Sequence, residues 1–187
     1  DYLDKSVKEG QMVIQRMSTT IDDFRNFFRP NKEKICFSVN EAVADVLRIL
    51  DAAFQNSGIA IFVKGDEKVM AYGYRNEYSQ VLINILVNAK DVLQERKVAG
   101  GRVHITISSQ DALSEVAVED NAGGIPPDVL PKIFDPYFTT KEKGTGIGLY
   151  MSKMIIENNM DGHITACNIV DGARLSLAVP ACGEEPA

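Results

Sequence analysis

The sequence lacks several features that define particular classes of protein. Its 187 residues contain no long apolar run, which excludes a membrane span and predicts no membrane contact by this stretch. There is no dense cluster of lysine and arginine, and the formal net charge is -6. Nucleic acid is therefore not expected as a partner, because binding a phosphate backbone requires concentrated positive charge.

Cysteine is also scarce. Cys36, Cys167 and Cys182 are far apart, and they form no C-x-x-C pair and have no nearby histidine. This pattern argues against structural zinc and predicts three reduced thiols in a cytoplasmic protein. The chain starts at Asp1 without a signal-peptide pattern, so we expect it to be a piece of a longer chain, which leaves a membrane anchor upstream open.

The apolar content, 45%, is enough for one good core with residues left for an appended helix. Residues 1–30 have apolar side chains in alternating steps of four and three, a heptad seam that needs a partner helix from a second copy or from upstream chain. The seam is Leu3, Val7, Ile14, Met17, Ile21, Phe24 and Phe28, with Gly10 as its gap. Pro30 ends this helix, so we place a domain boundary there, followed by a main unit over residues 31–180 and a loose tail over 181–187.

The main unit alternates helical and strand patterns. Ser38 and Glu41 form a capping box that opens its first helix. Helices are expected at about 38–56, 76–96, 127–133 and 145–158, and strands at 59–64, 68–71, 102–108, 113–119, 163–168 and 174–179. This order predicts an α+β fold, a two-layer sandwich in which a mixed, mostly antiparallel sheet has helices on one face.

Two glycine clusters stand out between Asp120 and Leu149. One, Gly123-Gly124, follows a strand-like run, and the other, Gly144 to Gly148, precedes a helix-like run. Loops of this kind allow positive φ or close approach of backbone to a ligand, and they can hold phosphate. The segment between them, Ile133 to Lys141, is aromatic and rich in threonine, which suggests a mobile lid with a hydrophobic anchor at its start.

A narrow polar ridge runs along the predicted helix 76–96. It includes Asn84, Asn88 and Asp91, which are spaced at i, i+4 and i+7. Asparagine is a poor residue inside a helix, because its amide competes for backbone hydrogen bonds. A solvated face would suit lysine and glutamate better, so the ridge favours a strip of oxygen ligands for Mg²⁺ carried by phosphate.

Four stretches resemble the motifs of the ATP-binding domain of sensor histidine kinases, a Bergerat fold of the GHKL superfamily. Their order and spacing agree with that family over about residues 35–180. They are Asn84-x-x-x-Asn88-Ala89 for the N box, Asp120-x-x-Gly123-Gly124 for the G1 box, Ile133-Phe134-x-Pro136-x-Phe138-Thr139-Thr140-Lys141 for the F box and Gly144-Thr145-Gly146-Ile147-Gly148-Leu149 for the G2 box. The opening helix resembles the second helix of the family's dimerisation hairpin, which implies a homodimer.

The resemblance implies a role for each matching residue. Asp120 would accept a hydrogen bond from the adenine amino group, Asn88 would ligate Mg²⁺ with Asn84 close by, and Lys141 would hold phosphate at the following helix N-terminus. Further ATP contacts would come from Asp91, Gly124, Ile125, Thr140, Gly144, Thr145, Gly146, Ile147, Gly148 and Leu149. The chain departs from the pattern at Ala122, at Asp161 and at Ala173-Arg174.

The implied function is transfer of the ATP γ-phosphoryl group to a histidine on the first hairpin helix, for relay to a response regulator in the cytoplasm. This sequence has only His104 and His163, and neither lies on the opening helix. We therefore expect the phosphoacceptor helix upstream of Asp1.

Two other functions stay open. One is an ATPase clamp of the same fold, but such proteins carry glutamate as a water-activating base where this chain has Asn84, which cannot act as a base. The other is a dimerisation or sensor module without turnover, against which the intact motifs argue.

Overall fold

The computed structural model describes residues 33–142 and 144–183. The chain divides into two units, Asp1–Lys32 and Glu33–Ala187, and the predicted heptad helix and dimerisation surface of the first unit lie outside the described residues. Within the described part, no helix is long and apolar enough to cross a membrane.

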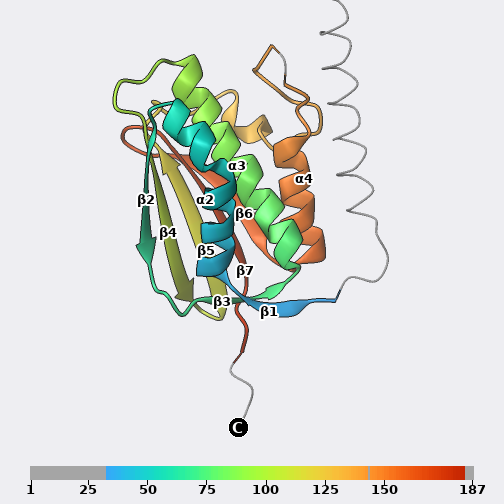
Figure 1. Cartoon of the computed structure of the whole chain (residues 1–187). Helices are drawn as coiled ribbons and strands as arrows, with labels where there is room; N and C mark the ends of the chain where they lie inside the picture. The colour runs from blue at the N-terminus through green and yellow to red at the C-terminus, as the bar shows by residue number, and fades with distance from the viewer. Residues whose placement is uncertain (1–32, 143, 184–187) are drawn as a thin grey trace, which may run out of the picture. The chain divides into compact units, whose positions relative to one another are not determined.

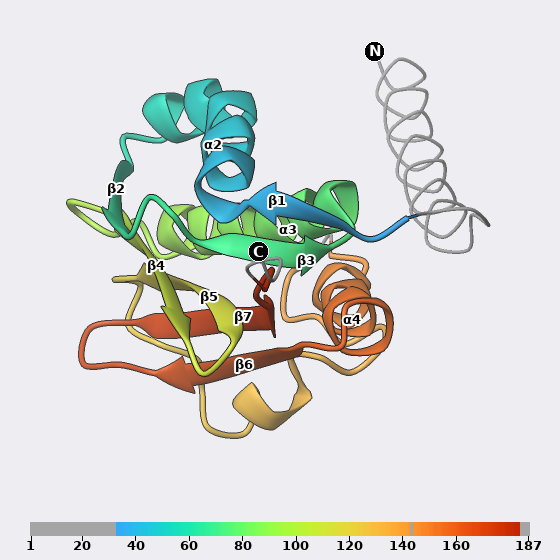
Figure 2. The same cartoon turned by 90° about the horizontal axis from the view of Figure 1, so that it is seen from below.

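The second unit is built on a five-stranded sheet with the strand order β2-β4-β5-β7-β6. Strand β2 pairs with β4 in parallel, and the other pairs are antiparallel. The strands are β2 (Ala60–Gly65), β4 (Arg102–Gln110), β5 (Leu113–Asp120), β6 (His163–Asn168) and β7 (Ala173–Pro180). Helices α2 (Val39–Asn56), α3 (Arg75–Glu95) and α4 (Gly148–Met154) lie on one face of this sheet (Figures 1 and 2), which confirms the predicted α+β sandwich.

The core between the sheet and the helices follows from the alternation of side chains along the strands and from the apolar arc of the helix. On β4 the buried positions are Val103, Ile105 and Ile107, and on β5 they are Ser114, Val116, Val118 and Asp120. Helix α3 contributes one apolar arc to the same layer, from Val81 to Leu93. Because successive strand side chains point to opposite faces, Asp120 is carried toward the helices with the valines before it. The last residue of β5 is therefore a buried carboxylate.

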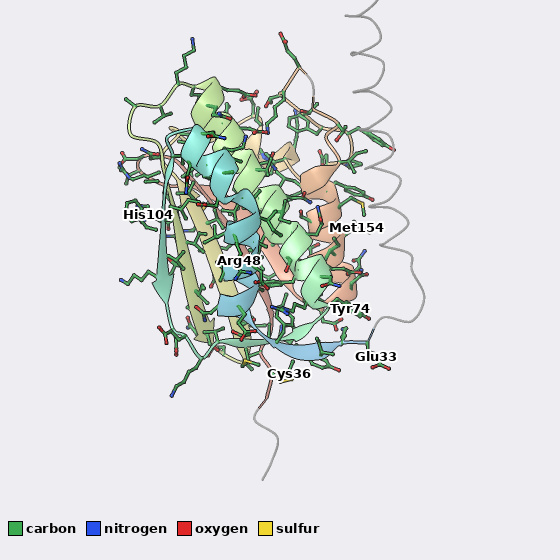
Figure 3. All side chains as sticks on the ribbon, viewed as in Figure 1. Glu33, Cys36, Arg48, Tyr74, His104 and Met154 are labelled. Atoms are coloured by element: carbon green, nitrogen blue, oxygen red, sulfur yellow. A yellow bond between two sulfur atoms is a disulfide. The ribbon has the colours of Figure 1, made fainter. Side chains whose placement is uncertain are left out.

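The opposite face of the sheet lies away from α2 and α3 (Figure 2). His104 lies there on β4 and stacks on Phe62 of β2, with ring centroids 4.9 Å apart. Figure 3 shows His104 on the side of the molecule away from Met154 of α4.

Three expected elements differ in the structure. The strands on either side of Gly65 belong to different sheets, because β3 (Met70–Gly73) pairs with β1 (Ile35–Ser38) instead of with β2. The predicted helix 127–133 is reduced to one 3₁₀ turn, Leu130–Lys132, in a segment where proline removes backbone donors. The predicted helix 145–158 starts only at Gly148, since Gly146 has a φ of 66°, and it ends in a π turn, Ile155–Asn159.

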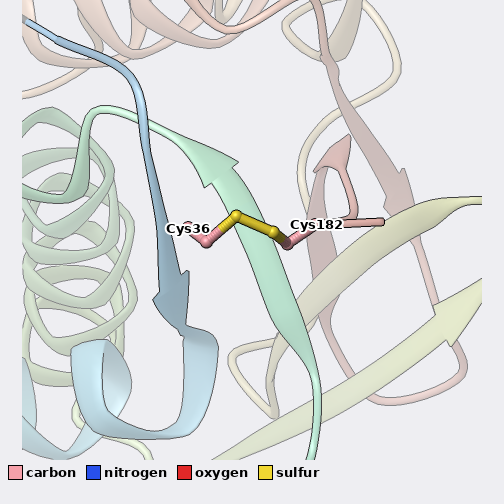
Figure 4. Close-up of a disulfide and its surroundings, with 2 residues drawn as sticks. All are labelled: Cys36 and Cys182. Carbon is pink, nitrogen blue, oxygen red and sulfur yellow. A yellow bond between two sulfur atoms is a disulfide. The ribbon is translucent and has the colours of Figure 1, made fainter. Parts of the chain in front are cut away.

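The prediction of three reduced thiols is wrong. Cys36 on β1 and Cys182 form a disulfide with their Cα atoms 5.6 Å apart (Figure 4), while Cys167 is free and exposed. The predicted loose tail is also wrong for its first residues, because the Ala181 amide donates to the Ala112 carbonyl and the Cys182 amide to the Met70 carbonyl. Strand β3 brings the cysteines together, since it pairs with β1 and also forms a bridge to Ala181.

We expect Cys36→Ser to lower the free energy of unfolding by about 2–5 kcal/mol under oxidising conditions, because the disulfide closes a long loop in the unfolded chain. The bonded residues are 146 positions apart. Denaturant unfolding measures the change, and Cys167→Ser is the matched control that should leave stability unaltered. Thiol titration of the unreduced, denatured chain should detect Cys167 alone. Reactivity of all three cysteines before reduction would contradict the pairing.

Candidate functional site

Most of the predicted site residues gather at one end of the second unit. Figure 1 shows the C-terminal end of α3, the end of β5, the turn between β6 and β7 and the segment from β5 to α4 at this end, which is the upper one in the view. The polar ridge of α3 and the acid at the end of β5, both noted in the sequence, therefore lie in the same region.

The first feature is a cluster of Asn88, Asp91 and Lys141. The Lys141 ammonium donates to Asn88 Oδ1 over 2.9 Å and to Asp91 Oδ2 over 2.8 Å. Asn88 and Asp91 are one helical turn apart on α3, so their oxygens meet on one face of the helix. The predicted oxygen strip does hold a cation in this structure, and that cation is a side chain from the lid.

The Asp91 carboxylate carries two cationic partners. Its Oδ1 lies 3.0 Å from Lys90 Nζ, and its Oδ2 bonds Lys141. Partial burial acts to raise the pKa of Asp91, but the hydrogen bonds and charges of Lys141 and Lys90 outweigh it, so this pKa falls below its ordinary value. Asp91 is therefore ionised at neutral pH and supplies a full negative charge next to Asn88.

Asn84 has a different environment from Asn88. Its amide nitrogen donates to the Gly148 carbonyl over 3.3 Å and to Ser152 Oγ over 3.2 Å, both on α4, and its oxygen accepts from Gln80. These bonds tie α3 to α4 beside the second glycine cluster. Asn84 thus positions the start of α4, and its carboxamide cannot take a proton from water.

The second feature is Asp120, which is only 9% exposed. Its Oδ1 accepts from the Ala122 amide over 2.8 Å and from the Ala173 amide over 3.4 Å. Among the described residues, none donates to Oδ2. Oδ2 is not fully buried, so a ligand can reach it, and it is the candidate acceptor of this site.

Gly172 explains how the backbone can approach this carboxylate. A Cβ built on Gly172 would collide with the Asp120 carbonyl and would lie 2.9 Å from its Oδ1. Any other residue at position 172 would push the β6–β7 turn away from β5. The Asp171-Gly172 turn therefore has a packing role as well as a conformational one.

Burial raises the pKa of Asp120 above its ordinary value. The Ala122 and Ala173 amides and the charge of Arg96 act in the opposite direction but do not cancel the effect of burial. The folded state therefore binds the Asp120 proton more tightly than the unfolded chain does. At pH values above this raised pKa, the ionised carboxylate costs folding free energy.

The lid and the second glycine cluster are packed together. A Cβ on Gly146 would lie 2.4 Å from the Tyr137 carbonyl carbon, and one on Gly144 would collide with Thr139 Oγ1. Ile133 at the start of the lid is buried, as expected for an anchor, while Thr140 and Thr145 are exposed. Ile147 caps α4, which begins with Gly148-Leu149. The glycines thus make room for the lid backbone beside Lys141.

The first glycine turn is held by residues that the sequence analysis did not single out. The Gly123 amide donates to the Asp171 carbonyl over 2.8 Å. Arg96 donates to the carbonyls of Ala122 and Gly124, and Asn168 bonds both backbone groups of Ile125. Neither Arg96 nor Asn168 belongs to a motif or an apolar pattern, so only the three-dimensional arrangement reveals them.

The donor types at this end fit a hard cation held partly by a ligand. No group of three or more His, Cys, Asp or Glu side chains that could hold a metal occurs among the described residues. Asn88 and Asp91 supply amide and carboxylate oxygens, which Mg²⁺ prefers, but the remaining ligands would have to come from phosphate or water.

The model of the family described as "Histidine kinase-, DNA gyrase B-, and HSP90-like ATPase" matches residues 73–182. The chain belongs to this family. The match includes every predicted site residue from Asn84 to Leu149, which agrees with the fold and with the clustering described above.

Several relatives within this ATPase family are sensor kinases. The chain is 32% identical to the two-component sensor PprA of Pseudomonas aeruginosa over 97% of its own length and 21% of that protein. It is 32% identical to the signal transduction histidine-protein kinase AtoS of Escherichia coli over 96% of its length and 29% of that protein. The chain thus spans less than a third of these relatives.

A solved structure of the catalytic domain of the histidine kinase ThkA superimposes with a TM-score of 0.73. It is 29% identical and covers 80% of this chain and 96% of the ThkA chain. The similarity extends over nearly the whole ThkA domain, so the described unit corresponds to one complete ATPase-family domain.

Asp120→Asn is expected to raise the melting temperature at neutral pH, because it removes a charge whose burial is unfavourable. The gain should vanish as the pH falls through the raised pKa of Asp120 toward the ordinary carboxyl value of 3.8. Below that value both folded and unfolded chains hold the proton. Thermal melts of the two proteins across this pH range measure the effect.

Asp91→Asn is the matched control with the opposite sign. The pKa of Asp91 is lowered, so its ionised form stabilises the fold above the ordinary carboxyl pKa, and this stabilisation is lost as the pH falls. The Asn variant should melt at a lower temperature at neutral pH. Shifts of equal sign in the two variants would refute this account of their electrostatics.

Proposed function

We propose that this chain is the ATP-binding catalytic domain of a sensor histidine kinase. It would transfer the ATP γ-phosphoryl group to a histidine on a helix that is not in this sequence, for relay to a response regulator. The observation that carries this proposal is the occurrence, at one end of the sheet, of two features: the largely buried Asp120, whose Oδ2 has no donor among the described residues, and the cation-holding cluster of Lys141, Asn88 and Asp91.

Asp120 suits the adenine end of the nucleotide. Its Oδ1 is fixed by backbone amides, so Oδ2 can accept the hydrogen bond of the adenine amino group. Because the carboxylate is buried, water competes poorly for it, and a base without a donor at that position would leave the oxygen unsatisfied. This contact would make the site selective for adenine.

The Lys141 cluster suits the phosphate end. The ammonium of Lys141 could exchange its bonds to Asn88 and Asp91 for phosphate oxygens, and Asn88 Oδ1 would then be free to ligate Mg²⁺. Mg²⁺, when bound, would neutralise charge on the β- and γ-phosphates. The backbone amides from Gly144 to Gly148 would add donors beside the start of α4.

The reaction itself needs positioning more than covalent help from the protein. The bond between the γ-phosphorus and the β–γ bridging oxygen breaks, a bond from the histidine nitrogen to the phosphorus forms, and ADP leaves. Charge accumulates on the phosphoryl and bridging oxygens, where Lys141 can stabilise it. No residue of this domain has to act as a base if the histidine attacks with its neutral nitrogen.

The names of the relatives support this reading of the family. PprA is called a two-component sensor and AtoS a histidine-protein kinase, and ThkA has been solved in complex with the response regulator TrrA. By analogy, a receiver domain would take the phosphoryl group here. A homodimer through the helix predicted for residues 1–30 and a cytoplasmic location belong to the same proposal.

The family also contains ATPases that release phosphate to water, and this reaction is the second candidate function. Such turnover requires a base that activates water, and position 84 holds an asparagine whose amide is engaged with Gly148 and Ser152 of α4. No proton can be taken up there. The kinase is therefore the better supported function.

Two variants separate the ends of the nucleotide. Asp120→Asn should weaken ATP binding by about 2 kcal/mol or more with or without Mg²⁺, because it converts an acceptor into a donor at the adenine end. Asn88→Ala should remove mainly the Mg²⁺-dependent part of the affinity, because it deletes a metal ligand. Calorimetric titration with ATP in Mg²⁺ and in EDTA measures both.

Asn40→Ala serves as the control, because its amide bonds the Asp66 carbonyl away from all predicted motifs. Its ATP affinity should equal that of the wild type in both buffers. Unchanged affinity in Asp120→Asn would remove Asp120 from the site. Equal losses in both buffers for Asn88→Ala would leave Asn88 with a structural role only.

The chain is expected to bind ATP but to label itself negligibly. His104 is stacked on Phe62 on the face of the sheet away from α2 and α3, and His163 is exposed at the start of β6. Adding the upstream histidine-bearing helix, alone or within an inactive full-length partner, should restore transfer in a manner that depends on Asn88. Incubation with radiolabelled ATP, followed by acid and base treatment, detects the phosphohistidine.

Two results would count against the kinase. One is acid-labile phosphate on this chain alone. The other is steady phosphate release to water at a rate that Asn84→Ala abolishes, which would favour the ATPase clamp.

A further inference from the structure

The turn formed by residues 121–125 follows β5 and carries the backbone away from Asp120. Gly123 and Gly124 have φ values of 87° and 81°, two successive left-handed residues that only glycine adopts at low cost. Glycine also has the greatest conformational freedom of any residue, so a two-glycine turn does not determine its own shape well. Contacts from outside the turn must fix it.

Asn168, the last residue of β6, supplies one such contact. Its Oδ1 accepts from the Ile125 amide over 2.7 Å, and its Nδ2 donates to the Ile125 carbonyl over 2.8 Å. A single carboxamide thus satisfies both backbone groups of Ile125, as a neighbouring strand would. A Cβ on Gly124 would lie 2.9 Å from Asn168 Oδ1, so the glycine also makes room for this side chain.

Arg96, which follows the last residue of α3, supplies the second contact. Its Nη1 donates to the Ala122 carbonyl and, over 2.7 Å, to the Gly124 carbonyl. The guanidinium therefore joins two carbonyls of the turn to the end of α3. Arg96 and Asn168 come from different elements, and between them they hold Ala122, Gly124 and Ile125.

The turn is connected directly to the orientation of Asp120. The Ala122 amide donates to Asp120 Oδ1, and Arg96 holds the carbonyl of the same alanine. A shift of Ala122 would therefore rotate the carboxylate and redirect Oδ2. Asn168 prevents the far end of the turn from moving, since Ile125 is bonded on both of its backbone groups.

We infer that Arg96 and Asn168 are positioning residues that set the adenine selectivity of the site by fixing the 121–125 turn and, through Ala122, the direction of Asp120 Oδ2. This inference rests on the proposed function, because it requires that Asp120 recognises the adenine amino group. Neither side chain has to touch the nucleotide. Both residues lie outside the four sequence motifs and act through their hydrogen bonds to the turn.

The experiment compares ATP with inosine triphosphate, which has a carbonyl oxygen in place of the adenine amino group and a proton on the adjacent ring nitrogen N1. Arg96→Met and Asn168→Leu remove the hydrogen bonds and retain most of the side-chain volume. In each variant the ATP affinity should fall about tenfold while the inosine triphosphate affinity changes little, because only the amino group depends on the direction of Oδ2. The ratio of the Kd for inosine triphosphate to the Kd for ATP therefore falls about tenfold.

Conservative variants and matched controls separate positioning from general stability. Arg96→Lys keeps a charged donor, so its ratio of dissociation constants should return part of the way to the wild-type value. Asn168→Asp places an oxygen against the Ile125 carbonyl and should not restore the ratio. Asn40→Leu and Arg48→Met remove comparable bonds, to the Asp66 carbonyl and to Asp45, on elements far from the turn in sequence. These controls should alter melting temperature by similar amounts and leave the ratio unchanged.

Wild-type selectivity that persists in both Arg96→Met and Asn168→Leu would overturn the inference and leave the proposed function intact. Equal loss of both nucleotides would also overturn it, since that result shows a general structural effect. A wild-type chain that binds both nucleotides equally well would overturn adenine recognition by Asp120, and the positioning role with it.

Discussion

The site depends on the burial of one carboxylate at the end of a strand. The period-two alternation of β5 places Asp120 in the same layer as Val116 and Val118, where charge is unfavourable. The surrounding structure compensates for this in part. Two backbone amides bind Oδ1, and Gly172 lets the β6–β7 turn approach closely. A fold optimised for stability alone would place an apolar residue here, so the acid indicates function.

The phosphate end is built on a different principle, because its charges are only partly buried and are paired. Lys141 reaches from the lid to Asn88 and Asp91, so the lid is attached to α3 through the groups that we assign to ligand binding. Ligand must therefore compete with an intramolecular ion pair before it can bind. The two ends of the site therefore differ. Asp120 Oδ2 has no donor among the described residues, whereas the oxygens of Asn88 and Asp91 already bind the Lys141 ammonium.

The sequence predicted those parts of the structure that local periodicity and motif spacing determine. The alternation of β5 and the ridge of α3 drew attention to Asp120 and Asn88, and the resemblance of the F box added Lys141. Long-range pairing could not be predicted in this way. Nothing near Cys36 indicates Cys182, and nothing near Gly65 shows that β2 and β3 join different sheets. Arg96 and Asn168 are exposed polar residues without a periodic pattern, so their bonds to residues 26 to 43 positions away became evident only from the fold.

The disulfide has a mechanical consequence. Cys36 and Cys182 lie near the two limits of the second unit, and almost all of its chain lies between them. A pulling force applied to the two chain ends would pass through the sulfur–sulfur bond, so the sheet and the nucleotide end would carry none of it. After reduction, the same force would act first on the short β1–β3 sheet and on the bonds of Ala181 and Cys182. The oxidised unit is thus shielded from tension in the chain, and the reduced unit is exposed to it.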